Sequence, residues 1–186
     1  MHKPSKFAPA LAATAIALAA AAVHATPDPQ ADVLQQWLQD QGLLRQAQRA
    51  RDAASELVLV AMNFLDVPYR NGGNSAEQGF DCSGFTRHIF QASLGLVLPR
   101  RAAQQAEAPA LKDVQRDDLQ AGDLVFFNTL KHAFSHVGIY LGNGKFIHAP
   151  RSGAEVRVDD MRQAYWRQRF DGARRAELET PAATLR

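Results

Sequence analysis

A single cysteine, Cys82, and two histidines further along the chain, His136 and His148, are the residue types of a nucleophilic site. Cys82 follows Asp81 at a point where a glycine-rich loop is predicted to lead into a helix. Aspartate is a favoured N-cap residue, and the positive end of the helix macrodipole favours a thiolate in the first turn. Backbone N–H groups of that turn can also stabilise an oxyanion. The segment therefore suits a cysteine that attacks a carbonyl group.

The two histidines lie on a predicted hairpin, because residues 141–145 (Leu-Gly-Asn-Gly-Lys) are typical of a hairpin connection. With a three-residue loop at 142–144, Gly138 falls opposite His148 and leaves space for its ring. His136 is then the diagonal neighbour of His148 on the same face, about 7–8 Å away at the backbone. In this arrangement His136 is the base for Cys82 and His148 orients it. A two-residue loop would place the histidines on opposite faces.

Other residues offer rival sites. His132 precedes the same strand in a stretch typical of an exposed loop, and His88 lies nearly two helical turns beyond Cys82, too far to be its base. For both we favour a solvated or half-buried histidine without a role. A Cys/His/His zinc site is conceivable from the residue types, but structural zinc sites have four ligands and usually paired cysteines. We therefore predict no metal and no other cofactor.

The first 25 residues have the composition of a secretory signal peptide. Lys3 and Lys6 precede an alanine-rich apolar run at 11–23, and small residues lead to a predicted cleavage site after Ala25. The run is short for a membrane span, and no cysteine at the cleavage site could carry a lipid. We expect export without a stable membrane anchor after cleavage. The alternatives are an uncleaved anchor or a buried helix.

Removal of this signal would leave 161 residues with 19 basic and 19 acidic side chains. The basic character of the whole chain therefore comes from the signal, and we expect no nucleic-acid partner. A chain of this length can form one domain with a substantial core. A lone cysteine cannot form an internal disulfide after export, so reactive chemistry is a good reason to retain it; the alternative is a buried, inert cysteine. Nothing in the sequence indicates an oligomer.

Hydrophobic spacing predicts helices in the first half of the chain and strands in the second. Helices are expected over 32–48 with an interruption at Gly42, over 53–65, and over 82–93. An irregular connection is expected over 99–118. The predicted strands are 123–128, 136–141, 145–149 and 155–158, with a short element at 166–170. This order is typical of an α+β domain with an antiparallel sheet.

Several motifs, taken in order, resemble a known family. They are Pro-Tyr-Arg-Asn-Gly-Gly at 68–73, Gly-Phe-Asp-Cys-Ser-Gly at 79–84, Leu-Pro-Arg at 98–100, Gly-Asp-Leu-Val-Phe-Phe at 122–127, Ser-His-Val-Gly-Ile-Tyr at 135–140 and Phe-Ile-His at 146–148. Over about residues 53–175 the chain resembles the NlpC family of bacterial cell-wall cysteine peptidases. The resemblance implies a reduced papain-like fold, with the nucleophile helix packed on an antiparallel β-sheet.

The resemblance also implies roles for individual residues. Cys82 resembles the family nucleophile, His136 the general base and His148 the polar residue that orients the base. Tyr69 resembles the tyrosine whose hydroxyl helps line the oxyanion site. A packing aromatic is the alternative for Tyr69, since buried tyrosines often only pack their rings.

Two residues beside the nucleophile, Asp81 and Ser83, resemble positions that hold the peptide stem of the substrate; Asp81 has the alternative of a simple helix cap. Family members hydrolyse amide bonds in peptidoglycan stem peptides that contain D-amino acids and meso-diaminopimelate. The chain departs from the common pattern at Asn71, where an aromatic residue is usual, and at Phe85, where leucine is usual. Both departures concern the shape of the pocket.

Taken together, the sequence predicts a signal peptide at 1–25, a helical extension of unassigned role at 26–52, an NlpC-type catalytic domain at 53–175 and a flexible tail at 176–186. The leading hypothesis is an exported, periplasmic or secreted peptidoglycan hydrolase, a D,L- or D,D-endopeptidase that forms a thioester on Cys82. One alternative is a peptidoglycan-binding module without catalysis. Another is a related cysteine amidase or acyltransferase.

Overall fold

The computed structural model describes residues 29–177. The predicted signal peptide and residues 178–186 of the predicted tail lie outside this range. Residues up to Gln39 and residues from Asp40 onward form two separate units. All the elements that surround Cys82 belong to the second unit, and the domain boundaries proposed from the sequence remain predictions.

The first helix is longer than predicted. Helix α1 runs without a break from Pro29 to Met62, so the predicted interruption at Gly42 and the separate second helix are wrong. A helix-interior glycine costs only about 1 kcal/mol relative to alanine, which the neighbouring helix-forming residues outweigh. The helix ends before Val67-Pro68, as the restricted geometry before proline requires. Within the second unit, only its last turns bury large side chains.

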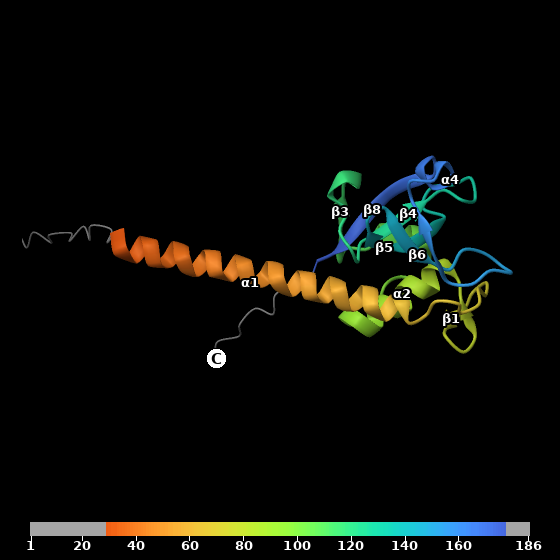
Figure 1. Cartoon of the computed structure of the whole chain (residues 1–186), viewed down its shortest axis with the longest axis horizontal. Helices are drawn as coiled ribbons and strands as arrows, with labels where there is room; N and C mark the ends of the chain where they lie inside the picture. The colour runs from red at the N-terminus through yellow and green to blue at the C-terminus, as the bar shows by residue number, and fades with distance from the viewer. Residues whose placement is uncertain (1–28, 178–186) are drawn as a thin grey trace, which may run out of the picture. The chain divides into compact units, whose positions relative to one another are not determined.

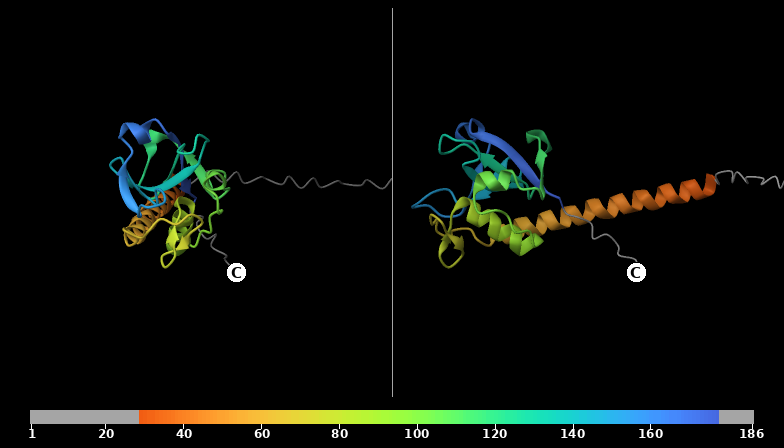
Figure 2. Two further views of the ribbon diagram at one scale, coloured as in Figure 1. Left: turned by 90° about the vertical axis from the view of Figure 1, so that its right-hand side faces the viewer. Right: turned by 180° about the vertical axis from the view of Figure 1, so that it is seen from behind.

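The second unit contains a six-stranded antiparallel sheet with the strand order β3-β8-β4-β5-β6-β7 (Figures 1 and 2). The strands are β3 (Leu111–Val114), β4 (Leu124–Phe127), β5 (His136–Gly142), β6 (Lys145–His148), β7 (Arg157–Asp160) and β8 (Phe170–Ala176). The other elements are β1 (Asn74–Ser75), β2 (Gly79–Phe80), α2 (Cys82–Leu94), α3 (Ala102–Ala106), the 3₁₀ turn η1 (Arg116–Asp118) and α4 (Ala164–Arg167). The predicted fold class, with a helix on an antiparallel sheet, is confirmed.

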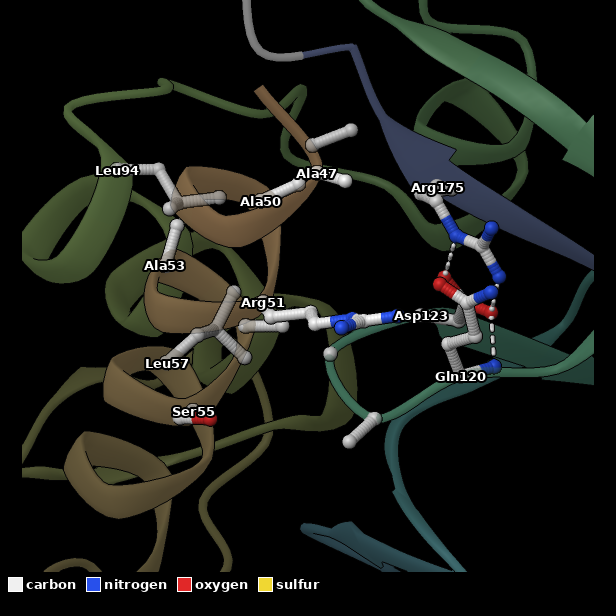
Figure 3. Close-up of a pocket in the computed structure, with 14 residues that line it drawn as sticks. Ala47, Ala50, Arg51, Ala53, Ser55, Leu57, Leu94, Gln120, Asp123 and Arg175 are labelled. Atoms are coloured by element: carbon white, nitrogen blue, oxygen red, sulfur yellow. Dashed lines mark hydrogen bonds and ion pairs between the residues drawn. The ribbon is translucent and has the colours of Figure 1, made fainter. Parts of the chain in front are cut away.

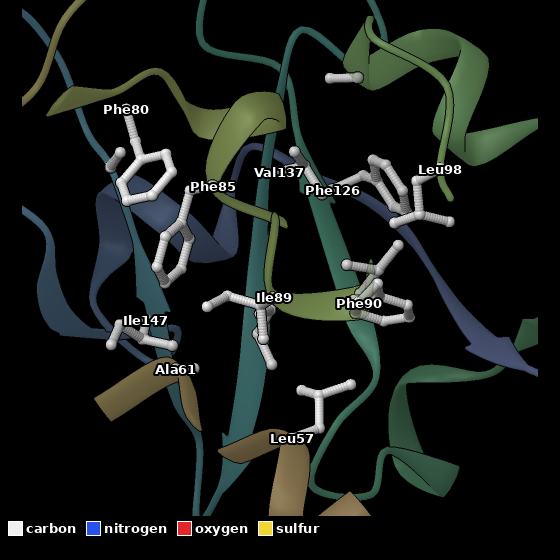
Figure 4. Close-up of a cluster of buried hydrophobic side chains, with 14 of the residues drawn as sticks. Leu57, Ala61, Phe80, Phe85, Ile89, Phe90, Leu98, Phe126, Val137 and Ile147 are labelled. Carbon is white, nitrogen blue, oxygen red and sulfur yellow. The ribbon is translucent and has the colours of Figure 1, made fainter. Parts of the chain in front are cut away.

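One face of the sheet holds α2 in place (Figure 4). Phe85, Ile89 and Phe90 of α2 are fully buried against strand residues such as Phe126 and Ile139. Leu57 and Ala61 of α1 complete this cluster. Complete burial of one such large apolar side chain stabilises the fold by about 1.5–3 kcal/mol. The position of Cys82, the first residue of α2, is therefore determined by the main core.

The opposite face carries a second, smaller core. Val125, Phe127, Phe146 and Ala173 of the strands pack against Trp166 of α4. Because both faces of the central strands are covered, all four residues of β4 are buried. This explains the unbroken apolar run that predicted a strand there.

Some elements differ from the sequence prediction. The connection predicted as irregular over 99–118 contains α3 and the edge strand β3, which pairs with β8 from Leu111 to Val114. Its exposed Lys112 and Asp113 are typical of an edge strand. β8 extends well beyond the short element predicted at 166–170, and β7 begins at Arg157 rather than at residue 155. Neither β3 nor β8 has a clear two-residue alternation of apolar side chains.

The hairpin between β5 and β6 reaches the predicted register by a different route. The turn has only two residues, Asn143 and Gly144, both with positive φ (51° and 74°), as a type I′ turn requires. Gly142 pairs with Lys145 and Tyr140 pairs with Phe146, so the register shifts by one residue between Tyr140 and Gly142. The predicted three-residue loop is therefore wrong. The irregularity at residue 141 acts as a bulge and restores the predicted pairing.

Gly84 provides a test of how closely α2 packs on the loop before it. A Cβ at residue 84 would lie 2.1 Å from the carbonyl oxygen of Gly73, whereas one at Gly42 of α1 would have no neighbour within 4 Å. Gly84→Ala should lower the free energy of unfolding by about 1–3 kcal/mol, the usual cost of overpacking. Gly42→Ala should be neutral or stabilising by up to about 1 kcal/mol. Urea unfolding measures both, and equal midpoints for Gly84→Ala and the wild type would contradict this packing.

Candidate active site

Asp81 caps α2 and so determines how the helix presents its first residue. Its backbone is extended (φ −90°, ψ 174°), and its Oδ1 accepts a hydrogen bond of 2.7 Å from the N–H of Gly84. Its Oδ2 accepts a second one, of 3.0 Å, from the N–H of Gly72. The predicted N-cap is confirmed. The carboxylate joins the glycine-rich loop to the helix and leaves Cys82 at the first helical position.

The Cys82 thiol is partly buried where α2 meets β5. Burial raises its pKa to about 11, although hydrogen bonds from the backbone N–H groups of Val137 and Ser83 act in the opposite direction. The effect of the helix start, which the sequence suggested would favour a thiolate, is outweighed by burial. A thiol in this position stays protonated at neutral pH and needs a base. Val137 directly follows His136, so the thiol meets the backbone of β5 one residue beyond the predicted base.

The two histidines that the hairpin argument paired lie in contact. His136 is 4% exposed and His148 is fully buried. The Nε2 atom of His136 lies 2.7 Å from the Nδ1 atom of His148, and the two rings are nearly perpendicular (84°). Since Nε2 of His136 is engaged with His148, Nδ1 is its remaining ring nitrogen for a proton from a neighbour.

An aromatic enclosure keeps this histidine pair neutral. Trp166 stacks on His136 with ring centroids 5.7 Å apart and packs edge-on against His148, while Phe127 and Phe146 flank the two rings. Burial lowers the pKa of His136 well below its usual value, and the proximity of His148 lowers it further. Burial also lowers the pKa of His148. Both imidazoles are therefore uncharged at neutral pH and able to accept a proton.

The sequence argument missed a carboxylate behind His148. Oδ2 of Asp159 lies 3.0 Å from Nε2 of His148, and the Arg157 guanidinium donates two hydrogen bonds, of 3.1 and 3.2 Å, to the same carboxylate. The hydrogen bond to His148 lowers the pKa of Asp159, so this side chain is ionised. Arg157 and Asp159 alternate along β7, and that spacing was the available signal. The connection at 149–156 left the register of β7 undetermined.

Asp81 and Ser83 belong to a second polar group beside the thiol. Arg100 donates to both carboxylate oxygens of Asp81, at 2.9 and 2.5 Å, and to the Ser83 hydroxyl at 3.0 Å. The buried Gln105 side chain donates to the carbonyl groups of Ser83 and Pro99, which fixes the segment that carries Arg100. The sequence motif contained Arg100, but no role was predicted for it.

Tyr69 also lies close to this group. Its backbone bridges to Phe80, directly before the helix cap. Burial raises the pKa of the Tyr69 hydroxyl, and the proximity of Cys82 and Asp81 raises it further. The hydroxyl therefore lies in the same polar surroundings as the thiol.

A hollow of about 560 Å³ opens above the thiol. Cys82, Asp81 and Ser83 line it, and so do Arg101 and His132, both of which are exposed. The rim is therefore basic. The other rival histidine, His88, packs against the rings of Phe64 and Phe80. The remaining residues that line the hollow are Asn71, Gly72, Arg100, Ala102, Ala103, Phe134 and Ser135.

A second hollow of about 570 Å³ lies between α1 and the turn before β4 (Figure 3). Its walls are largely alanine side chains of α1, and its buried Asp123 is paired with Arg175 at 2.7 and 2.8 Å. Among the described residues that line it there is no cysteine or histidine. The hollow above Cys82 is therefore the candidate active site, although the alanine-lined hollow has a similar volume.

Within residues 29–177, no group of three or more His, Cys, Asp or Glu side chains is arranged to hold a metal ion. Over the same range, no helix combines the length and the apolar character that a membrane crossing requires.

Comparisons with known proteins agree on one family. The model of the NlpC/P60 family matches residues 66–175. The murein DD-endopeptidase MepH of Escherichia coli K12 is 38% identical over 139 residues, which cover 72% of this chain and 51% of MepH. The gamma-DL-glutamyl hydrolase of Bacillus subtilis 168 is 41% identical over 120 residues, which cover 64% of this chain and 28% of that protein. The chain thus spans about half or less of these relatives.

A solved structure supports the fold. The crystal structure of an NlpC/P60 family protein from Bacillus cereus ATCC 10987 superimposes with a TM-score of 0.61 at 35% sequence identity. The match covers 68% of this chain and 40% of the Bacillus cereus chain.

The buried histidine pair predicts how stability depends on pH. The pKa values of His136 and His148 are lowered in the folded protein, so below pH ~6.5 the unfolded chain binds protons that the folded protein does not. Stability should be complete above that pH and fall below it, by up to about 1.4 kcal/mol per pH unit for each histidine. The lowered pKa of Asp159 adds a further loss only at more acidic pH, below its value in the unfolded chain.

Urea unfolding at pH 7.5 and pH 5.5 measures this dependence. His148→Gln should reduce the loss between the two pH values, because one buried imidazole is removed. His132→Asn is the matched control and should leave the loss unchanged, because His132 is exposed. Equal unfolding free energies of the wild type at both pH values would contradict the buried, neutral pair.

Proposed function

Because the chain belongs to the NlpC/P60 family, we propose that it is an exported peptidoglycan hydrolase that cuts an amide bond in murein stem peptides or in their cross-links. It is a D,L- or D,D-endopeptidase. This function rests on the placement of Cys82 at the start of α2, where its thiol contacts the backbone of Val137, the residue that follows His136, and on the contact that holds His136 against His148.

In the first step the Cys82 sulfur attacks the carbonyl carbon of the scissile amide while its proton passes to Nδ1 of His136. The C=O electron pair moves onto oxygen. The backbone N–H of Cys82 and the hydroxyl of Tyr69 hold this oxyanion, since donors aimed at developing charge contribute most in a site that excludes water. The raised pKa of the thiol explains why attack and proton transfer are coupled.

In the second step the C–N bond breaks, His136 returns the proton to the leaving amine, and the acyl group remains on Cys82 as a thioester. In the third step His136 takes a proton from water, whose oxygen attacks the thioester carbon. The C–S bond breaks, His136 gives the proton to the sulfur, and the carboxylic acid leaves. The 2.7 Å contact with His148 holds the His136 ring in place while Nδ1 gains and loses the proton. No step requires a cofactor.

The hollow above the thiol supports binding of the peptide stem. Asp81 and Ser83 face it and are held in place by Arg100, which gives the substrate a fixed polar wall. Arg101 on the basic rim suits the carboxylate groups that stem peptides carry. These assignments agree with the roles that the family resemblance implies for Asp81 and Ser83.

The proposed location follows from the N-terminal sequence and from the relatives. Residues 1–25 are proposed as the export signal, which directs residues 26–186 to the periplasm or the exterior. The relative MepH is a murein DD-endopeptidase, which agrees with a site of action at the cell wall. Residues 26–52 are proposed as an extension outside the catalytic domain, and residues 176–186 as a tail.

Cys82→Ala should abolish hydrolysis, because no other described side chain is proposed to form the acyl intermediate. The purified protein without its signal is incubated with intact sacculi, and the soluble products are analysed by mass spectrometry. The new carboxyl group, together with the position of the new amino group on diaminopimelate or on alanine, identifies the amide that is cut. Ser93→Ala, in the last turn of the same helix, is the control and should keep full activity. Full activity of Cys82→Ala would end the proposal.

Arg101→Gln should raise the KM for stem peptides about two- to five-fold with little change in kcat, because an exposed charge contributes up to about 1 kcal/mol to binding. The difference from the wild type should shrink at high salt, which screens exposed charges. Arg167→Gln removes an exposed arginine outside the hollow and should change neither constant. An unchanged KM for Arg101→Gln at low salt would rule out the rim as a carboxylate contact.

A further inference from the structure

His148 has a polar contact at each of its two ring nitrogens. On one side its Nδ1 meets Nε2 of His136, and on the other its Nε2 meets the carboxylate of Asp159. We propose that Asp159 is a positioning residue that selects the tautomers of both histidines and thereby leaves Nδ1 of His136 free to act as the base. This inference rests on the proposed function of Cys82 and His136.

A neutral imidazole has one N–H donor and one acceptor nitrogen. An ionised carboxylate can only accept, so His148 must carry its proton on Nε2 and present Nδ1 as an acceptor. His136 must then donate from Nε2. Its Nδ1 is left with a lone pair, which is the form that can take a proton from the thiol.

Arg157 explains why the carboxylate keeps this orientation. In the β6–β7 pairing, Arg157 lies opposite His148 and Asp159 lies opposite Phe146, so both side chains stand next to the histidine on one face. Arg157 donates from Nε to Oδ1 and from a terminal nitrogen to Oδ2 of Asp159. Oδ2 therefore accepts from both Arg157 and His148, and the carboxylate is held between them.

The same tautomer of His148 also suits the site after His136 has been protonated. When His136 gains a proton on Nδ1, its Nε2–H still donates to His148, whose Nε2–H still donates to the negative charge of Asp159. No proton has to move along the chain of contacts. Without the carboxylate, His148 is free to adopt the other tautomer, in which its Nδ1–H opposes the N–H of His136.

Asp159→Ala removes the acceptor that selects the tautomer of His148. His148 can then carry its proton on Nδ1, which forces His136 to carry its own proton on Nδ1, where it blocks the base. Asp159→Asn is the conservative variant, because an amide oxygen in the position of Oδ2 can still accept from His148 and from the terminal nitrogen of Arg157.

The test compares the wild type, Asp159→Ala, Asp159→Asn and the control Asp160→Ala, each without the signal. Asp159→Ala should lower kcat on muropeptides about ten-fold or more, because part of the protein then holds the base in the wrong tautomer, with little change in KM. Asp159→Asn should recover at least about three-fold of this loss. Asp160→Ala removes the neighbouring carboxylate of β7, which pairs with Arg162, and should stay within about two-fold of the wild type.

Long-range ¹H–¹⁵N spectra of histidine-labelled protein at pH 7.5 read the tautomers without substrate, and circular dichroism confirms that each variant is folded. The wild type and Asp160→Ala should show both buried histidines protonated on Nε2, and Asp159→Ala should show a population protonated on Nδ1. Unchanged tautomers in a folded Asp159→Ala, or wild-type kcat in that variant, would overturn the inference. A wild type that shows the expected tautomers but does not cut muropeptides would instead contradict the proposed function.

Discussion

The register between β5 and β6 is the constraint on which the site depends. An irregularity at residue 141, just before a two-residue turn, brings Tyr140 opposite Phe146 and leaves His136 and His148 on one face. Gly138 makes this possible, because a Cβ there would lie 3.1 Å from the Cβ of His148 and 2.7 Å from the Phe146 ring. A slip of one residue would turn one imidazole toward the core around α2 and break the pair.

The two cores of the fold contribute different parts of the site. The larger core fixes α2 and hence the position of Cys82, whereas the smaller one, built around Trp166, encloses the histidines. Burial disfavours both the thiolate and the imidazolium ion. It therefore raises the pKa of the thiol and lowers the pKa values of the two imidazoles. Before substrate is attacked, the Cys82 thiol and the His136 imidazole are therefore both uncharged. The charged form of this pair is supported by contacts that already exist, from the N–H groups near the sulfur to Asp159 behind His148.

Sequence reasoning succeeded where the determining interactions are local. The cap at Asp81 and the helix that follows depend on neighbouring residues, and the His136–His148 register depends on one short hairpin. It failed where pairing partners are remote in the chain: β3 forms only because β8 lies beside it, and Asp159 reaches His148 only through a register that the connection at 149–156 does not determine. The predicted interruption at Gly42 failed for a different reason, because a single glycine destabilises a helix too little to interrupt α1.

The central claim is that Cys82 carries the acyl group during hydrolysis. Intact-mass spectrometry of the protein, quenched in acid during turnover of a muropeptide, tests it most directly. The account predicts a transient mass increase equal to the acyl fragment, located on the peptide that contains Cys82 and removed by hydroxylamine, as a thioester would be. Turnover that proceeds without such an adduct, or an adduct on a different residue, would contradict the account.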